Sequence, residues 1–205
     1  MTFKRFVVDL AKKLKPPGDG WKFTRSQFRR KINPSCVDFI DPVWTFEPYG
    51  AVSFQPVVGL YLPEVEDIWV EVSGYKRNDN FTFFNKIPDA SAEKAHITYT
   101  PTLYQNNYSI ESEIIDAACG VFNIIFLYAE EYFSKIHGEN STMNSIYSGV
   151  IPKERGNQSL KFAIVRGLLG DVDYIERYCA NEIDPEGPKD FEIANRIREY
   201  FNSKS

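Results

Sequence analysis

Cysteine and histidine are scarce in this chain of 205 residues, with three and two copies. Cys36, Cys119 and Cys179 are too widely spaced for a Cys-x-x-Cys pair or a disulfide framework, which is typical of a reducing compartment. His96 and His137 stand apart in the sequence, and neither belongs to a His-Glu-x-x-His run. We therefore expect no metal site.

The motifs of common enzyme families are also missing. The chain has no Gly-x-Ser-x-Gly nucleophile elbow, no Gly-x-x-x-x-Gly-Lys phosphate loop and no Gly-x-Gly-x-x-Gly dinucleotide loop. Cys119 and Cys179 lie in helical patterns that mark them as small core residues. We expect no catalytic residue and no cofactor, and hence no enzyme. An unrecognised site, in which His96 or Asp41 meets other polar groups, is the alternative.

No hydrophobic run is long enough to span a membrane. Between Ala117 and Ala129 the only polar side chain is that of Asn123, but charged residues close this stretch short of the roughly 20 apolar residues that a span needs. This apolar stretch predicts a central helix that is buried on all sides. The segment from Met1 to Lys15 has scattered charges and no signal-peptide core. We expect a cytoplasmic protein with no membrane partner.

A hydrophobic content of 43% and a charged content of 25% are typical of a globular protein. We expect a single domain over 1–205, with a helix and a β-rich half in 1–104 and a helical half in 105–205. The first helix should carry Phe3, Val7, Leu10 and Leu14 on its apolar face and end at Pro16.

Short alternating runs broken by proline follow this helix and predict an antiparallel meander. The strands are expected at Trp21 to Thr24, Phe28 to Ile32, Val37 to Ile40, Val43 to Phe46 and Ala51 to Leu62, with weaker ones at Phe81 to Phe84 and Ile97 to Tyr99. Pro56 should lie at an edge or a bulge, since it cannot donate to a ladder. Pro63 starts a short helix that ends near Gly74 and buries Val65, Ile68, Trp69 and Val72.

Helical periodicity dominates after Tyr104. The sequence predicts a long helix from Ser109, its cap, to Ile136, and three shorter ones at Ser159 to Leu169, Asp171 to Glu182 and Pro188 to Asn202. The fold class is therefore α+β, with the N-terminal helix and antiparallel β-meander packed with a C-terminal helical half.

Charge is distributed unevenly along the chain. The first 31 residues contain ten of the 24 Lys and Arg but two of the 28 acids, a net charge of +8, so the remainder carries −12. Arg25, Arg29 and Arg30, interleaved with aromatic residues such as Trp21 and Phe28, favour a nucleic-acid-binding or regulatory module as an alternative function. A sequence pI near 5.3 argues against a dedicated nucleic-acid binder.

The order of elements resembles that of immunity proteins of bacterial polymorphic and contact-dependent growth inhibition toxin systems. The similarity lies in organisation: a leading helix, the start Gly20-Trp-Lys-Phe23, a meander closing with Phe54-Gln-Pro-Val-Val-Gly-Leu-Tyr61, and a helical tail with Ser159-Leu-Lys-Phe-Ala163 and Leu169-Gly-Asp171. The resemblance implies an inhibitor that binds a cognate toxin domain, often a nuclease, and covers its active site.

A basic toxin domain would bind an acidic surface. Acids of the meander and of the helix after Pro63, all expected on exposed faces, are the predicted partner interface. They are Asp38, Asp41, Glu47, Glu64, Glu66, Asp67 and Glu71.

Overall fold

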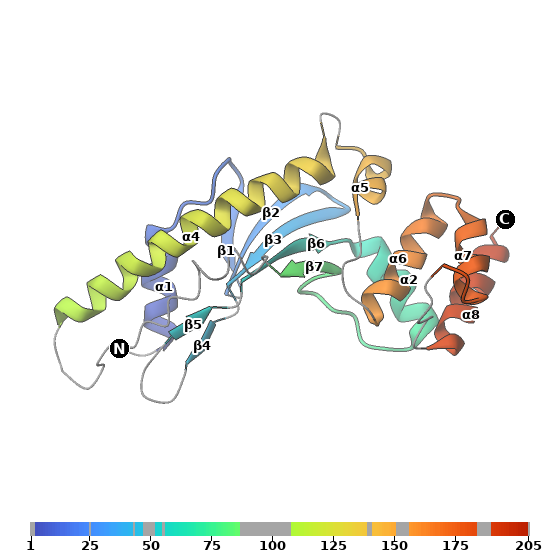
Figure 1. The fold of residues 1–205 in the computed structure, drawn as a ribbon, viewed down its shortest axis with the longest axis horizontal. Coiled ribbons are helices and arrows are strands. Elements are labelled where there is room, and N and C mark those ends of the chain that lie inside the picture. Colours follow the sequence, from blue (N-terminus) through green and yellow to red (C-terminus); the bar gives the residue numbers. More distant parts are fainter. Residues whose placement is uncertain are drawn as a thin grey trace. The chain divides into compact units, whose positions relative to one another are not determined.

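The computed structural model describes residues 3–24, 26–42, 44–46, 52–54, 56–86, 108–138, 141–150, 156–183 and 190–204 (Figure 1). Within these ranges it is an α+β protein, as predicted. The predicted strand at Ile97 to Tyr99 lies outside the described residues.

Five strands form one antiparallel sheet in the order β1-β2-β3-β6-β7, and β4 pairs with β5 in a separate hairpin. This order follows the chain apart from the β4-β5 pair, which confirms the antiparallel meander. Pro56 lies between β5 and β6 and divides the long run that was expected as one strand. The strands are β1 Trp21–Thr24, β2 Gln27–Asn33, β3 Cys36–Asp41, β4 Trp44–Phe46, β5 Val52–Phe54, β6 Val57–Tyr61 and β7 Phe83–Lys86.

The helices also lie close to their predicted positions. Gly74 ends α2 in the left-handed conformation and donates its N–H to the carbonyl of Val70. The short helix α5, capped by Thr142, was not predicted from the sequence. The helices are α1 Phe3–Lys13, α2 Pro63–Ser73, α4 Tyr108–His137, α5 Met143–Gly149, α6 Asn157–Leu168, α7 Val172–Cys179 and α8 Phe191–Asn202. Because α4 begins at Tyr108, Ser109 lies inside the helix and is not its N-cap.

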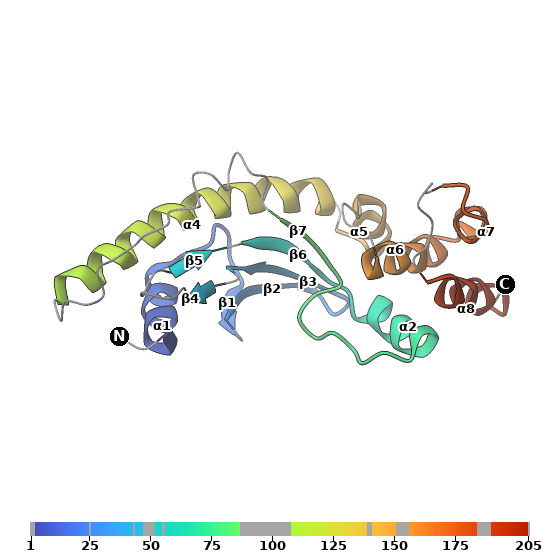
Figure 2. The same ribbon diagram turned by 60° about the horizontal axis from the view of Figure 1, so that its bottom comes forward.

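Helix α4 lies over the sheet (Figure 2), and aromatic side chains join it to the β1-β2 hairpin. The register places Phe23 opposite Phe28, and the Phe28 ring lies 6.1 Å from that of Phe122 and 5.6 Å from that of Phe126, centroid to centroid. On the side of α1, Leu10 and Leu14 are buried as predicted, and Lys13 Nζ lies 2.8 Å from Asp116 Oδ1 of α4.

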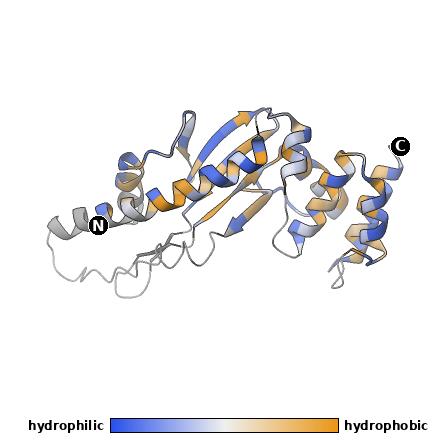
Figure 3. Cartoon of the chain, turned by 45° about the horizontal axis from the view of Figure 1, so that its top comes forward, coloured by the Kyte–Doolittle hydropathy of each residue, from blue (hydrophilic) through white to orange (hydrophobic). Residues whose placement is uncertain are grey.

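The expectation that α4 is buried on all sides is wrong. Its buried side chains are mostly three, four or seven positions apart, which places them on one side of the helix. Leu127, in the middle of the apolar run, is 68% exposed. Figure 3 shows hydrophobic and hydrophilic residues along the same helix. A helix that packs on a sheet buries only the side that faces the sheet, so an apolar residue on its other side stays exposed. The buried residues are Ile115, Phe122, Ile125, Phe126, Ala129, Phe133 and Ile136.

The chain divides into two compact units. The first comprises Met1–Lys31, Asp38–Val58 and Lys86–Phe133, and the second comprises Ile32–Val37, Gly59–Asn85 and Ser134–Ser205. Each unit draws on both halves of the sequence. The single domain over 1–205 stays a prediction. In the second unit α2, α6, α7 and α8 pack against one another.

The end of α5 passes so close to α4 that a side chain at Gly149 has no room. A Cβ at this position would lie 2.9 Å from Ile136 Cα and 3.0 Å from its carbonyl oxygen, both backbone atoms. We expect Gly149→Ala to lower the free energy of unfolding by about 1–3 kcal/mol, the usual cost of overpacking. Gly120→Ala is the control: a Cβ at this helical position would meet no side chain and no other element within 4 Å among the described residues, so the variant should gain up to about 1 kcal/mol. Urea unfolding of both variants tests the expectation, and equal stabilities would contradict it.

Candidate functional site

The exposed side of α2 carries a row of three acids. Val65, Ile68, Trp69 and Val72 are buried as predicted, which turns the opposite side of the helix toward solvent. That side presents Glu64, Asp67 and Glu71 at positions i, i+3 and i+7. We call these three residues the acidic row. It keeps three of the seven acids that the sequence predicted for a partner interface.

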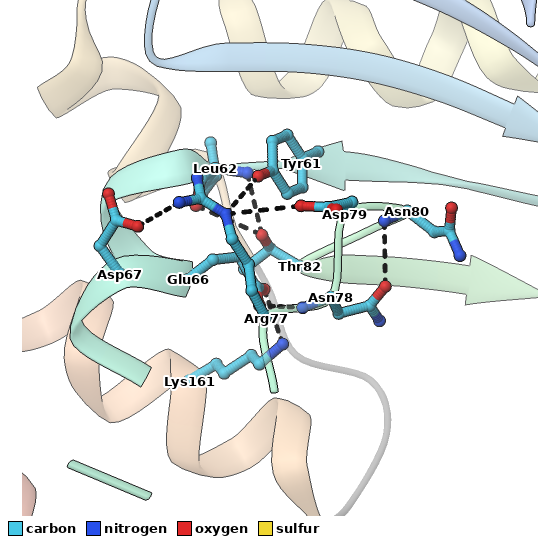
Figure 4. A network of polar contacts seen from close by, with 10 residues as sticks. All are labelled: Tyr61, Leu62, Glu66, Asp67, Arg77, Asn78, Asp79, Asn80, Thr82 and Lys161. Atoms are coloured by element: carbon cyan, nitrogen blue, oxygen red, sulfur yellow. Dashed lines mark hydrogen bonds and ion pairs between the residues drawn. The ribbon is translucent and has the colours of Figure 1, made fainter. Parts of the chain in front are cut away.

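Glu66 was expected on the same exposed face, and this prediction is wrong. Its side chain is fully buried, and its Oε1 lies 2.6 Å from Nζ of Lys161, itself buried, on α6 (Figure 4). Nζ also lies 5.5 Å from the centre of the Trp69 ring. Burial lowers the pKa of Lys161, and the Glu66 carboxylate opposes this shift. A buried charge needs such a partner, because an unpaired one would lose its hydration without compensation.

The segment from Gly74 to Thr82 connects α2 to β7, and we call it the α2–β7 loop. Arg77 fixes its middle: Nε lies 2.8 Å from Tyr61 Oη, and the guanidinium forms ion pairs with Asp67 and Asp79 (Figure 4). These contacts raise the pKa of Arg77, the hydrogen bond with Tyr61 being the main cause. Arg77 therefore stays charged and links the loop to β6 and α2.

Further hydrogen bonds hold the remainder of the loop. The N–H of Asn78 donates to Glu66 Oε2 over 3.4 Å, and the N–H of Asn80 donates to Asn78 Oδ1 over 3.0 Å. At the end of the loop, Leu62 N–H donates to Thr82 Oγ1 over 2.9 Å, and Thr82 N–H donates to the Leu60 carbonyl over 2.8 Å. The buried carboxylate of Glu66 thus contacts both Lys161 and the loop backbone.

Tyr75 is the large exposed aromatic residue of this loop. Its ring stacks on Trp69, with centroids 6.0 Å apart and planes 27° apart, yet the residue is 55% exposed. Its N–H donates to Ser73 Oγ, which orients the backbone at the start of the loop. The second unit therefore exposes both the acidic row of α2 and, two residues after the end of that helix, the ring of Tyr75.

The other predicted interface residues are located elsewhere. Asp38 on β3 is fully buried and accepts two hydrogen bonds from Arg30, of 2.7 and 3.1 Å, so it is no surface acid. Asp41 is half-buried, and its Oδ2 lies 2.6 Å from Gln27 Nε2. Glu47 lies outside the described residues. The seven acids therefore do not form one surface, because burial and pairing remove some of them from solvent.

The basic segment that suggested nucleic-acid binding is partly built into the first unit. Phe28 is buried against α4, and the Arg30 guanidinium lies 4.7 Å from the ring centre of Trp21 and 5.6 Å from that of Phe133. Lys22 and Lys31 remain exposed. Arg25 lies outside the part of the chain that the structure describes.

The candidate groups for enzyme chemistry do not gather into a site in the described part. His137 is the last residue of α4 and is buried, whereas His96 lies outside the described residues. Burial raises the pKa of the Cys119 and Cys179 thiols, the opposite of what a reactive thiolate needs. No group of three or more His, Cys, Asp or Glu side chains with the arrangement of a metal site occurs among the described residues.

The partners of α2 were not predicted from the sequence. Lys161 lies among the buried residues of α6. A lysine within an apolar stripe is the signal from which a buried carboxylate partner could have been predicted. Glu66 falls at the edge of the apolar side of α2, next to Val65, where the pattern alone does not distinguish buried from exposed. Nothing in the sequence indicates that Tyr75 is exposed, because an isolated aromatic residue is usually assigned to a core.

Among the helices that the structure describes, none is both long and apolar enough to cross a bilayer. Comparison of the chain with known proteins finds no matching family model, no similar curated protein and no similar solved structure.

Proposed function

We propose that this chain is an immunity-type protein that binds a basic bacterial toxin domain, such as a nuclease, and neutralises it by covering its active site. The observation that carries the proposal is the acidic row on the exposed side of α2. Carboxylates on a surface attract a cationic partner and select against partners of like charge. A toxin that binds phosphates with Lys and Arg offers the complementary surface.

The geometry also supports the proposal because it weakens the case for nucleic-acid binding and for an enzyme. Binding of nucleic-acid bases would need free aromatic faces, and Phe28 is buried while Arg30 is paired with Asp38. An enzyme would need convergent titratable groups, and the described carboxylates of the meander are engaged by Arg30 and Gln27. We place the protein and its target in the cytoplasm, where a nuclease would act.

A direct test uses the protein encoded by the neighbouring reading frame. We expect Glu64→Gln, Asp67→Asn and Glu71→Gln together to weaken its binding about 10- to 100-fold, at about 0.5–1 kcal/mol for each exposed charge. Added salt should weaken the binding of the unmodified chain more than that of this variant. Isothermal titration calorimetry at two ionic strengths measures both effects.

The matched control is Asp173→Asn, Glu192→Gln and Glu199→Gln, which removes the same charge from exposed positions on α7 and α8. This control should bind as the unmodified chain does. Equal losses in both triple variants would show a general charge effect and contradict a role of the acidic row. A neighbouring protein that is neither toxic nor bound would contradict the proposed function.

A further inference from the structure

The α2–β7 loop is held in one conformation although it is mostly exposed. Within the second unit it makes contacts through Arg77 on Tyr61 and Asp67 and through Asn78 on Glu66 (Figure 4). The Tyr75 ring also stacks on Trp69. Ordering a loop costs conformational entropy for every residue that is fixed. Loops that are held on a rigid scaffold often carry binding residues.

The contact with Glu66 is unusual because it involves a buried ion pair. Glu66 is 0% and Lys161 is 5% exposed, and their side chains lie on different helices, α2 and α6. An apolar pair of similar volume would serve a hydrophobic core equally well or better. What an apolar pair cannot supply is the acceptor Oε2, which lies 3.4 Å from the N–H of Asn78. The ion pair therefore supplies a hydrogen-bond acceptor to the loop backbone, which apolar packing cannot supply.

We infer that the Glu66–Lys161 pair is a positioning device that holds the α2–β7 loop for contact with the partner, with Tyr75 as the anchoring side chain. This inference rests on the proposed function for the identity of the partner, a basic protein domain. Lys161 fixes the Glu66 side chain, and Glu66 fixes the loop at Asn78. The loop then presents the exposed Tyr75 ring to the partner without an ordering cost on binding.

The exposed face of Tyr75 suits a cationic side chain of the partner. An aromatic face attracts the Lys or Arg side chains of a basic partner. Tyrosine also supplies a large contact area at low entropic cost. Trp69 is 3% exposed and lies under Tyr75, so its fluorescence should report an occupant of this position.

The positioning role is tested first without any partner, by hydrogen exchange on the full chain. In Glu66→Leu/Lys161→Met both charges are removed, and amides of residues 74–82 should exchange at least tenfold faster while those of α8 stay unchanged. In Glu66→Gln/Lys161→Met an amide oxygen can still accept from Asn78, so part of the protection should return. If Glu66→Leu/Lys161→Met fails to fold, Glu66→Gln/Lys161→Met is the test. Its amide exchange should then be faster than in the unmodified chain in the loop only. Loop exchange that equals that of the unmodified chain would overturn the inference.

The recognition role is tested by binding of the neighbouring-frame protein to Tyr75→Ala and to Glu66→Leu/Lys161→Met. We expect about a tenfold or larger loss of affinity in each, together with a change of Trp69 fluorescence on binding that is absent in Tyr75→Ala. Tyr200→Phe, on α8, is the control and should bind normally. Unchanged affinity of both variants, with the unmodified chain still binding, would overturn the loop inference and leave the proposed function standing. If the unmodified chain does not bind, the proposed function fails, and the recognition role fails with it.

Discussion

Lys161→Met should lower the free energy of unfolding by about 3–5 kcal/mol, the cost of leaving a buried charge without its partner. In the structure Glu66 Oε1 lies 2.6 Å from Lys161 Nζ, and both residues are buried. Methionine fills much of the same volume, so that the loss comes from the unpaired carboxylate and only slightly from packing. Urea unfolding followed by circular dichroism measures the effect.

The double variant Glu66→Leu/Lys161→Met separates charge from packing. With both charges absent no buried charge is left unpaired, and most of the lost stability should return. A double variant as unstable as Lys161→Met would mean that packing, and not the ion pair, limits this site. A Lys161→Met variant within about 0.5 kcal/mol of the unmodified chain would contradict burial of the pair.

The single variant Glu66→Leu should also change how stability depends on pH. Burial lowers the pKa of Lys161 from its ordinary value of 10.5, and Glu66 limits this shift. The unfolded chain therefore binds the Lys161 proton more tightly than the folded one, and stability rises with pH between the folded pKa and 10.5. Without the carboxylate the folded pKa falls further, so the rise should begin at a lower pH than in the unmodified chain.

This pH dependence is best measured below pH 10. Burial and the hydrogen bond to Glu64 raise the pKa of Tyr147, so the unfolded chain loses the Tyr147 proton first, and stability falls above the ordinary tyrosine pKa of 10. Unfolding at several pH values from about 7 to 9.5 avoids that contribution. The partly buried thiols of Cys119 and Cys179, with raised pKa values, lower the stability of both proteins alike over this range, so the variant is compared with the unmodified chain. A stability of Glu66→Leu that does not rise with pH relative to that of the unmodified chain would refute the buried, uncompensated ammonium.

Phe126→Ala should cost about 3–5 kcal/mol, whereas Leu127→Ala, at the next position, should change stability by about 0.5 kcal/mol or less. Phe126 is 3% exposed, and its ring meets that of Phe28 edge-on at 5.6 Å. Leu127 is 68% exposed. The two residues stand in one apolar run, so the sequence gives no reason for different effects. Thermal and urea unfolding of the two variants provide the comparison.

The variants Phe126→Ala and Leu127→Ala also test which side of α4 faces the hairpin. A large loss for Leu127→Ala would show that a further element covers it, and a small loss for Phe126→Ala would contradict the packing on β2. Phe122→Ala, one turn earlier and fully buried, should resemble Phe126→Ala.

The element pattern could be read from the sequence because it depends on neighbours along the chain. Strand β1 lies at Trp21–Thr24 as predicted, Pro63 starts α2, Gly74 ends it, and Asp171 caps α7 with its side chain. Alternation, capping residues and helix-breaking residues are local signals. The short α5 was missed because seven residues with no strong periodicity resemble a loop.

The candidate site depended on contacts that are distant in sequence. The acidic row could be predicted because Glu64, Asp67 and Glu71 recur at helical spacing. Glu66 and Asp38 could not be assigned, because Lys161 and Arg30, their partners, come from other elements. An acid with a cationic partner can be buried, and one without such a partner stays in water.

The sequence by itself determined that this is an α+β protein with an antiparallel meander, a helix with three acids on one side, and no recognisable catalytic or metal motif. Only the tertiary structure decided which charges are buried, which side of α4 is exposed and how the α2–β7 loop is held. The physical reason is that periodicity reports the face on which a residue lies, whereas burial of a charge depends on a partner that the fold brings from elsewhere in the chain.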